Sequence, residues 1–284
     1  MSDRKPRGLV LGGGGVAGIA WEYGLLAALE ERGVDLNDAD VVVGTSAGSV
    51  VGTALRSDAV RAMYDSQFVP IETEAAEMAG FDVQELMAVF AEAQQETDDT
   101  AARALIGRYA LTVPQERMPE ATRIAMLESQ LPSRDWPERV LRVTAVDAET
   151  GAFVVYDARA GAPLGRAIMA SCSIPGVGPT MPIGGRLLMD GGIRSGTNAD
   201  VADDCDRVIV IACNPEPERS ATGPTLAETV ATRASGSTFV IEADQASRAA
   251  FGPNPLLMSS RAGSAEAGFA QGTALAEELA AFWS

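Results

Sequence analysis

A short apolar run that ends in a Gly-x-Ser-x-Gly pattern constrains this sequence most. Residues 41–43 are consecutive valines, and Gly44-Thr45-Ser46-Ala47-Gly48 follows them directly. β-Branched residues indicate a buried strand, and the glycines beside Ser46 indicate a turn too tight for larger side chains. Such a turn into a helix holds a serine hydroxyl out of the sheet, with free helix N–H groups behind it. Taken alone, the pattern is equally compatible with an ordinary strand–helix turn.

The residues before this turn predict a β-α-β unit. Residues 8–11 form a short apolar run that ends in four consecutive glycines, Gly12–Gly15. Apolar residues then recur at helical spacing between residues 16 and 30, and the valine run follows. Two strands joined by one helix imply parallel pairing and a right-handed crossover. We therefore expect an α/β fold with a mainly parallel central sheet flanked by helices.

The stretch after the turn, from about residue 57 to residue 131, is predicted to be mostly helical. Asp82 and Glu85 have the spacing of a helix capping pair, and apolar residues repeat at helical intervals on both sides of residue 95. This segment interrupts the alternation of strands and helices. It is either a helical layer of the core or a cap over a site.

The remaining chain returns to strands. They are predicted at 140–146, 152–156, 186–189 and 207–212. Residues 164–171 predict a short helix, and residues 225–284 a helical C-terminal extension. Since no linker is long enough to divide the chain, we expect residues 1–284 to form a single domain with an insertion at about 57–131.

Composition excludes several classes of function. The 22 basic and 39 acidic residues give a net charge of −17, which repels nucleic acid, so no nucleic-acid partner is expected. The three cysteines lack the spacing of metal ligands, and we expect neither a metal site nor a cofactor. Their number, together with the lack of an apolar leader or span, predicts a cytoplasmic protein.

The sequence contains no histidine. A Ser-His-Asp triad and a Cys-His pair are therefore excluded, and a nucleophilic Ser46 needs another base. The single lysine, Lys5, lies in the polar N-terminus. Asp190 follows an apolar strand and precedes Gly191-Gly192, which predicts a place at the strand end where parallel α/β sheets carry their sites. Alone, this pattern is more often a simple Asp-Gly turn.

The run Gly12–Gly15 indicates an anion-binding loop at a helix N-terminus. Gly13-x-Gly15-x-x-Gly18 fits the fingerprint of a dinucleotide-binding fold, and the same loop can hold an oxyanion during acyl transfer. A dinucleotide site needs an acid at the end of the second strand. That strand ends at Ser46 and Asp40 precedes it, so the oxyanion interpretation is favoured.

Four segments, in this order, resemble the patatin-like phospholipase family over roughly residues 8–212. They are residues 12–18, 44–48, 170–175 (Ala-Ser-Cys-Ser-Ile-Pro) and 190–192. The resemblance implies a three-layer sandwich and a Ser-Asp dyad, with Ser46 as nucleophile in an elbow formed with Gly44 and Gly48. It also implies Asp190 as base, an oxyanion hole made by the N–H groups of Gly13, Gly14 and Gly15, and hydrolysis of lipid esters with transient membrane contact.

One position departs from the family pattern. Where the family commonly has Arg or Lys, this chain has Ala17, which removes a cation suited to a lipid phosphate. Arg194 either supplies a substitute charge or pairs with a surface acid. The alternative to an enzyme is a catalytically silent protein that binds an acyl chain or a partner. If Asp190 is the base, we expect it in a site that restricts water.

Overall fold

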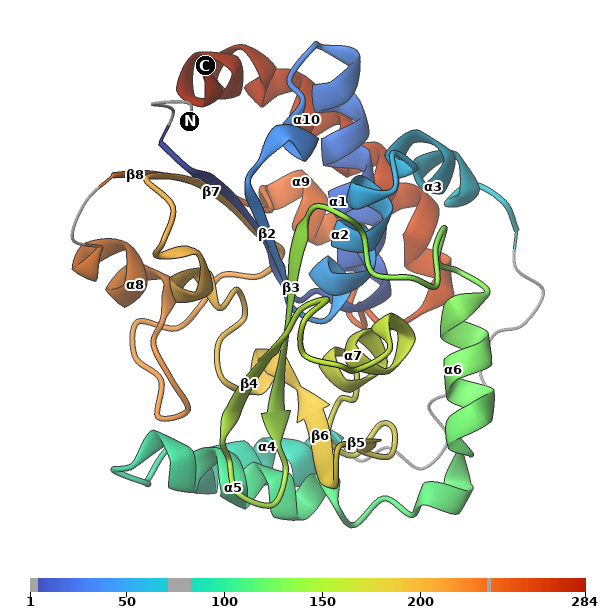
Figure 1. Cartoon of the computed structure of the whole chain (residues 1–284), viewed down its shortest axis with the longest axis vertical. Helices are drawn as coiled ribbons and strands as arrows, with labels where there is room; N and C mark the ends of the chain where they lie inside the picture. Colours follow the sequence, from blue (N-terminus) through green and yellow to red (C-terminus); the bar gives the residue numbers. More distant parts are fainter. Residues whose placement is uncertain (1–4, 71–82, 234–235) are drawn as a thin grey trace.

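The computed structural model describes residues 5–70, 83–233 and 236–284. In these residues one eight-stranded sheet runs through the molecule, in the order β5-β6-β3-β2-β1-β7-β8, with β4 paired to β3 (Figure 1). The strands are β1 (Arg7–Leu11), β2 (Val41–Gly44), β3 (Val140–Asp147), β4 (Phe153–Tyr156), β5 (Met181–Ile183), β6 (Arg186–Asp190), β7 (Arg207–Ala212) and β8 (Ser237–Glu242).

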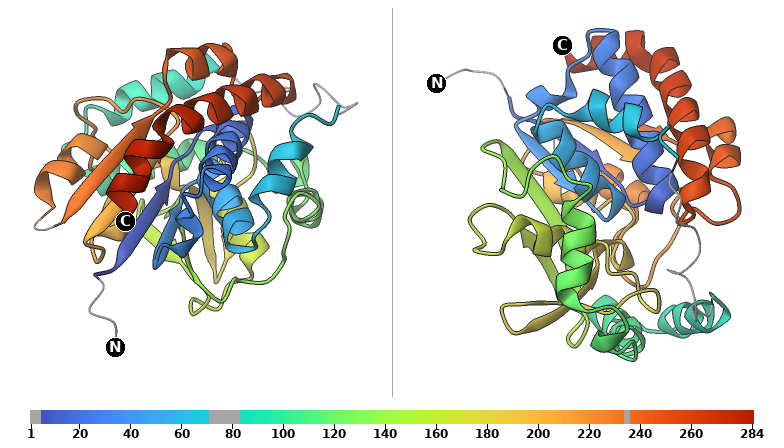
Figure 2. Two further views of the ribbon diagram at one scale, coloured as in Figure 1. Left: turned by 90° about the horizontal axis from the view of Figure 1, so that it is seen from above. Right: turned by 90° about the vertical axis from the view of Figure 1, so that its right-hand side faces the viewer.

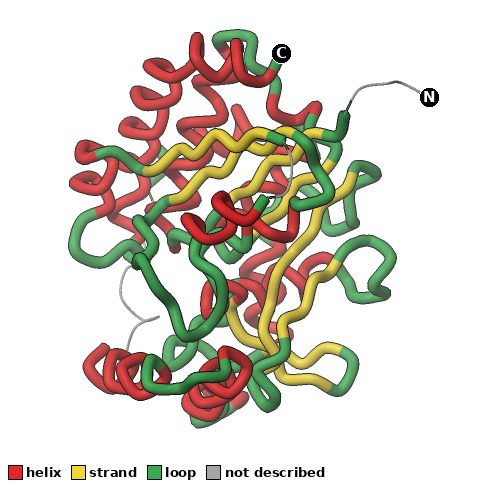
Figure 3. The backbone as a smooth tube through the Cα atoms, turned by 90° about the vertical axis from the view of Figure 1, so that its left-hand side faces the viewer, coloured by secondary structure: helices red, strands yellow, loops and turns green. Residues whose placement is uncertain are grey.

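Helices cover both faces of the sheet, which confirms the predicted α/β fold; Figure 3 shows them in front of and behind the strands. They are α1 (Gly15–Glu31), α2 (Ala47–Arg56), α3 (Val60–Ser66), α4 (Val83–Ala93), α5 (Asp99–Ala110), α6 (Glu120–Glu128), α7 (Leu164–Ser171), α8 (Leu226–Thr232), α9 (Gln245–Phe251) and α10 (Arg261–Trp283). The predicted capping residue Asp82 lies outside the described residues.

The predicted β-α-β unit is confirmed and forms the centre of the sheet. β1 pairs in parallel with β2 on one side and with β7 on the other. Leu9 and Leu11 pack in the core under α1, α2 and α10, whereas Val10 packs on the opposite face with residues of β7 and α8. Both faces are buried, which explains why these strands are short, continuous apolar runs.

β3 joins the parallel part of the sheet to β6, the strand that ends at Asp190. It runs parallel to β2, with Val143 opposite Gly44, and continues past the end of β2 to Asp147. β6 pairs with this extension in the antiparallel direction, which places Asp190 opposite Ala145. The sequence-based reason for the position of Asp190 was therefore wrong: its strand is not parallel, and it reaches this edge because β3 is long.

The helical segment after β2 contributes to the core. Ala102, Leu105 and Ile106 of α5 pack against Val146 and Met189 of the sheet. α3 contacts α1, and α6 contacts α7. In Figure 1, α4 and α5 lie across the lower end of the sheet.

The C-terminal region differs from the prediction of helix alone. Residues Ser237–Glu242 form β8, a parallel edge strand beside β7. The rest is helical, and α10 lies along α1, as both views in Figure 2 show. Glycines allow this close approach: an added Cβ would lie 2.1 Å from the Ala265 carbonyl oxygen at Gly24, and 2.1 Å from the Trp21 carbonyl oxygen at Gly268.

This packing predicts opposite effects for two glycines of α10. Gly268→Ala forces the two helices apart, and we expect it to lower the free energy of unfolding by about 1–3 kcal/mol. Gly263→Ala is the matched control, because its Cβ would meet only Ala250 at 3.9 Å, and alanine favours helix. Urea denaturation measures both; equal stability of the two variants would contradict the close packing.

Candidate active site

Ser46 lies in a strained turn between β2 and α2. Its backbone has φ 51° and ψ −115°, a conformation that residues other than glycine rarely adopt. A Cβ at Gly48 would lie 2.1 Å from the Leu11 carbonyl oxygen, and one at Gly44 would lie 2.6 Å from the Gly48 carbonyl oxygen. Glycines on both sides are therefore required by the backbone itself, and we call this turn, residues 44–48, the elbow.

Hydrogen bonds hold the elbow in place. The Ser46 N–H donates to the Ser171 hydroxyl at 2.8 Å, and the Ser46 carbonyl accepts from the Ser49 hydroxyl at 2.6 Å. The Gly48 N–H donates to the Gly12 carbonyl at 3.0 Å. The strained residue is thus fixed from its own helix, from α7 and from the glycine loop that follows β1.

Asp190 reaches Ser46 from the end of β6. The Ser46 side chain lies close enough to Asp190 to lower the pKa of its carboxyl group, and Asp190 Oδ1 accepts from the Gly192 N–H at 2.7 Å. The Asp190 N–H donates to the Ser173 carbonyl at 2.9 Å. The structure therefore brings together two residues that the sequence separates widely.

The carboxyl group of Asp190 is only 5% exposed, as expected for a site that restricts water. Burial raises its pKa to about 6, and the hydrogen bonds from Gly192 and Ser46 oppose this shift by favouring the charged form. At neutral pH the group is ionised, yet it binds a proton more tightly than an exposed aspartate does. Both properties are needed for accepting a proton from a hydroxyl.

The glycine loop, residues 12–15, lies against the elbow. A Cβ at Gly13 would lie 3.5 Å from the Ser46 Cβ. The Gly13 N–H donates to the Gly196 carbonyl at 2.8 Å, so this amide is already occupied. Within the described residues, no acceptor is found for the amides of Gly14 and Gly15 at the start of α1. Of the three glycines expected to bind an oxyanion, these two have free donors.

Close packing explains the uninterrupted run of glycines. A Cβ at Gly14 would lie 2.6 Å from the Cys213 Sγ, and Gly15 has a φ of +63°. Ala17 is fully buried, and its N–H donates to the Pro255 carbonyl at 2.9 Å. The C-terminal chain is therefore hydrogen-bonded to the backbone of Ala17, and this position is closed to solvent.

Sequence reasoning missed the buried residues that link the elbow to Asp190. The Asn198 side-chain amide donates to the Thr45 hydroxyl at 3.1 Å and to the Gly191 carbonyl at 3.1 Å. The Thr45 and Thr144 hydroxyls are 2.9 Å apart. Asn198 follows Gly196-Thr197, which looks like an ordinary turn, so no local signal pointed to this role.

Cys172 lies next to the site. In the sequence it stands out only as a member of the segment 170–175 that resembles the family. Its Sγ lies 3.9 Å from the Ser49 hydroxyl. Burial and the charge of Asp190 raise the pKa of the thiol to about 12. Cys172 therefore stays protonated at neutral pH and does not compete with Ser46 as a nucleophile.

Two alternatives left by the sequence are settled by contacts. Arg194 donates to both carboxylate oxygens of Asp200, at 2.9 and 2.6 Å, so it pairs with an acid. Asp40 accepts from the Arg7 N–H at 2.7 Å, at the start of β2. It is thus at the opposite end of the strand from the position where an acid would hold a dinucleotide ribose.

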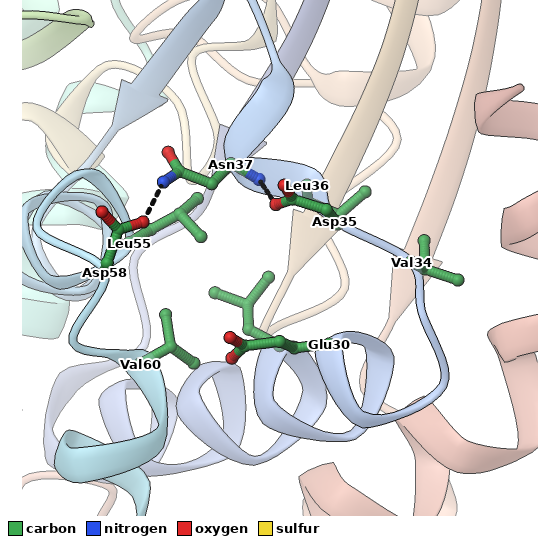
Figure 4. A pocket seen from close by; sticks show the side chains of 9 residues that line it. Glu30, Val34, Asp35, Leu36, Asn37, Leu55, Asp58 and Val60 are labelled. Atoms are coloured by element: carbon green, nitrogen blue, oxygen red, sulfur yellow. Dashed lines mark hydrogen bonds between the residues drawn. The ribbon is translucent and has the colours of Figure 1, made fainter.

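Cavities differ in their relation to the elbow. One of about 550 Å³ is lined by Val16 and Val50, which flank the glycine loop and the elbow. Another, of about 210 Å³, lies near the end of α1 and contains the carboxylates of Glu30 and Asp58 (Figure 4).

In the described part of the chain, no group of three or more His, Cys, Asp or Glu side chains is arranged to bind a metal.

Comparisons with known proteins agree with the motifs. The family model described as Patatin-like phospholipase matches residues 9–203. Lysophospholipase nte1 of Aspergillus niger is 44% identical over 73 residues, 26% of this chain and 4% of the relative. Lysophospholipase NTE1 of Coccidioides immitis is 49% identical over 55 residues, 19% of this chain and 3% of the relative. The chain thus matches a small fraction of the length of these curated relatives.

Two solved structures are similar over most of this chain. VipD from Legionella pneumophila is 13% identical, with 97% of this chain and 67% of that chain covered and a TM-score of 0.44. The type III effector protein ExoU is 18% identical, with 95% and 53% covered and a TM-score of 0.39.

The buried carboxyl group predicts a pH-dependent gain in stability for Asp190→Asn. Because folding raises the pKa of Asp190 from 3.8 to about 6, its contribution to stability is complete below pH 4 and is lost as the pH rises through 6. The neutral amide avoids this loss. We expect a higher Tm for the variant at pH 8 and equal Tm values near pH 4, measured by circular dichroism; a lower Tm at pH 8 would contradict the cause assigned to the shift.

Proposed function

The chain belongs to the patatin-like phospholipase family, and from that premise we propose that it is a lipid ester hydrolase that acts through a dyad of Ser46 and Asp190. The observation that carries the proposal is the buried Asp190 beside the side chain of the equally buried Ser46 at the elbow, in a sequence without histidine. The raised pKa of Asp190 supports its role as the base.

In the proposed mechanism, Asp190 accepts the proton of the Ser46 hydroxyl while Oγ attacks the ester carbonyl carbon. The tetrahedral intermediate collapses, the bond between the acyl carbon and the ester oxygen breaks, and Asp190 gives the proton to the leaving alkoxide. Asp190 then takes a proton from water, which attacks the acyl-enzyme. The fatty acid leaves and Ser46 recovers its proton.

The oxyanion hole is proposed to consist of the amides of Gly14 and Gly15. Both lie at the positive end of α1, directly after the residue that contacts Ser46. A preorganised donor of this kind contributes roughly 3 kcal/mol to stabilising the transition state. Gly13 holds the loop to residue 196 instead, which keeps the two free amides in position.

The substrate class follows from the family and is a lipid. None of the helices in the described ranges combines the length and the apolar character that crossing a membrane requires. Transient contact with a lipid surface and a cytoplasmic location stay predictions.

Replacing Ser46 tests the dyad against a catalytically silent protein. We expect Ser46→Ala to reduce hydrolysis of p-nitrophenyl esters to background and to abolish covalent labelling by a fluorophosphonate. Ser57→Ala is the control, since Ser57 lies at the far end of α2 and its hydroxyl donates to the Thr53 carbonyl of the same helix. Labelling of Ser46→Ala at the wild-type rate, or no labelling of the wild type, would reject the dyad.

The pKa of Asp190 predicts the pH profile of catalysis. Because the base acts only when ionised, kcat/KM should rise about tenfold per pH unit below pH 6 and level off above it. Initial rates on an uncharged ester between pH 4.5 and 8 measure this, with circular dichroism at each pH as a check on folding. A profile that stays flat across pH 5–7 would assign the base elsewhere.

A further inference from the structure

The larger pocket lies between α1, α2, α3, α6 and the start of α10. Val16 follows Gly15 directly, and Val50 lies one helical turn after Ser46, so the pocket begins beside the proposed reaction centre. Its volume of about 550 Å³ lies within the range of small-ligand sites. α3 and α6, which form its outer part, both lie on the right-hand side of Figure 1.

The pocket wall is mostly apolar. Ile19, Met63, Met126, Leu131 and Met258 contribute to it. Met126 is 42% exposed, although methionine is normally buried. Unbranched, flexible methionine side chains adapt to ligands of varied shape, and an acyl chain is such a ligand.

Arg261, at the start of α10, is the one charged side chain among the described residues that line the pocket. Its Nε donates to Gln67 Oε1 at 3.0 Å and its Nη2 to the Ser66 carbonyl at 2.8 Å. Its Nη1 lies 3.5 Å from the Val69 carbonyl. A guanidinium has five N–H groups, so these contacts leave one free on each terminal nitrogen.

No carboxylate in the described residues pairs with Arg261, and burial lowers the pKa of its guanidinium. The chain has 39 acidic residues for 22 basic ones, so an arginine without an acid is unusual here. Two neighbouring N–H groups match the paired oxygens of a phosphate or carboxylate. The free charge therefore suits an oxyanion on the ligand.

We propose, on the basis of the function inferred above, that this pocket binds an anionic single-chain lipid ester. The apolar wall holds the lipid chain, and Arg261 binds the phosphate or carboxylate group of the same molecule. The cation that is missing at Ala17 is thus supplied from the C-terminal helix. The enzyme then prefers anionic esters to neutral ones of equal chain length.

Hydrolysis of three lauroyl esters below their critical micelle concentrations tests this preference: 1-lauroylglycerol 3-phosphate, 3-O-lauroylglycerate and neutral 1-lauroylglycerol. We expect Arg261→Gln to raise KM at least about tenfold for the anionic esters and to leave the neutral ester unchanged. Arg261→Lys keeps the positive charge but lacks the paired N–H donors of a guanidinium, so its KM for the anionic esters should lie between the values of the wild type and Arg261→Gln. Loss on the phosphate alone identifies phosphate as the anion; loss on both anionic esters shows that either oxyanion binds.

The matched control is Arg108→Gln, which removes an exposed arginine from α5, away from the pocket. Equal changes on neutral and anionic esters in Arg261→Gln, or the same selectivity shift in Arg108→Gln, would overturn the proposal. Unchanged turnover of the neutral ester also shows that Arg261→Gln is folded.

A binding measurement separates this inference from the proposed catalysis. Calorimetry with dodecyl phosphate should give a Kd at least about tenfold weaker for Arg261→Gln than for wild type. Met126→Trp, which fills the pocket, should weaken binding as well, whereas Met87→Trp, at a 62% exposed methionine outside it, should not. Binding of dodecyl phosphate without hydrolysis of any ester would reject only the proposed catalytic activity. Hydrolysis that does not distinguish anionic from neutral esters would reject only the proposed binding of the anion in the pocket.

Discussion

The geometry of the candidate site depends on the hydrogen bonds that the Asn198 side chain donates. It is fully buried and donates to the residue before Ser46 and to the residue after Asp190. Buried donors and acceptors that lose a partner cost more than an ordinary hydrogen bond contributes, so this arrangement has few alternatives. Its left-handed φ of 50° is one that asparagine tolerates better than most residues. The serine and the carboxylate are therefore positioned by a third residue that bonds to the neighbour of each.

The sequence could not reveal that Asn198 lies between the serine and the carboxylate. Strand β2, helix α1 and the elbow were predictable because valine runs, helical periodicity and paired glycines are local signals. The direction of β6 was not, since an apolar run reads the same in parallel and antiparallel pairs. β8 was missed although its Thr-Phe-Val-Ile run is a local strand signal, because this run is short and stands in a region that is otherwise helical. The occupied amide of Gly13 depends on residue 196, which only the tertiary fold brings near.

The C-terminal region joins stability and chemistry in one element. α10 packs through glycines onto α1, and the segment before it accepts the Ala17 N–H at the base of the glycine loop. The same helix begins with Arg261 in the pocket wall. Strain at Ser46 and the burial of Asp190 both oppose folding, and tight helix packing of this kind offsets such costs. A region without recognisable motifs thus supports the loop that the motifs define.

The central place of β1 has a consequence for biosynthesis. Its partners are β2, which follows soon after in the chain, and β7, whose Arg207 lies opposite Arg7. Until the ribosome has released the chain beyond Ala212, one edge of this apolar strand has no partner. Closing so long a loop is entropically unfavourable and slows folding. Until β7 has been made, the nascent chain therefore carries an unpaired apolar strand edge, which favours aggregation.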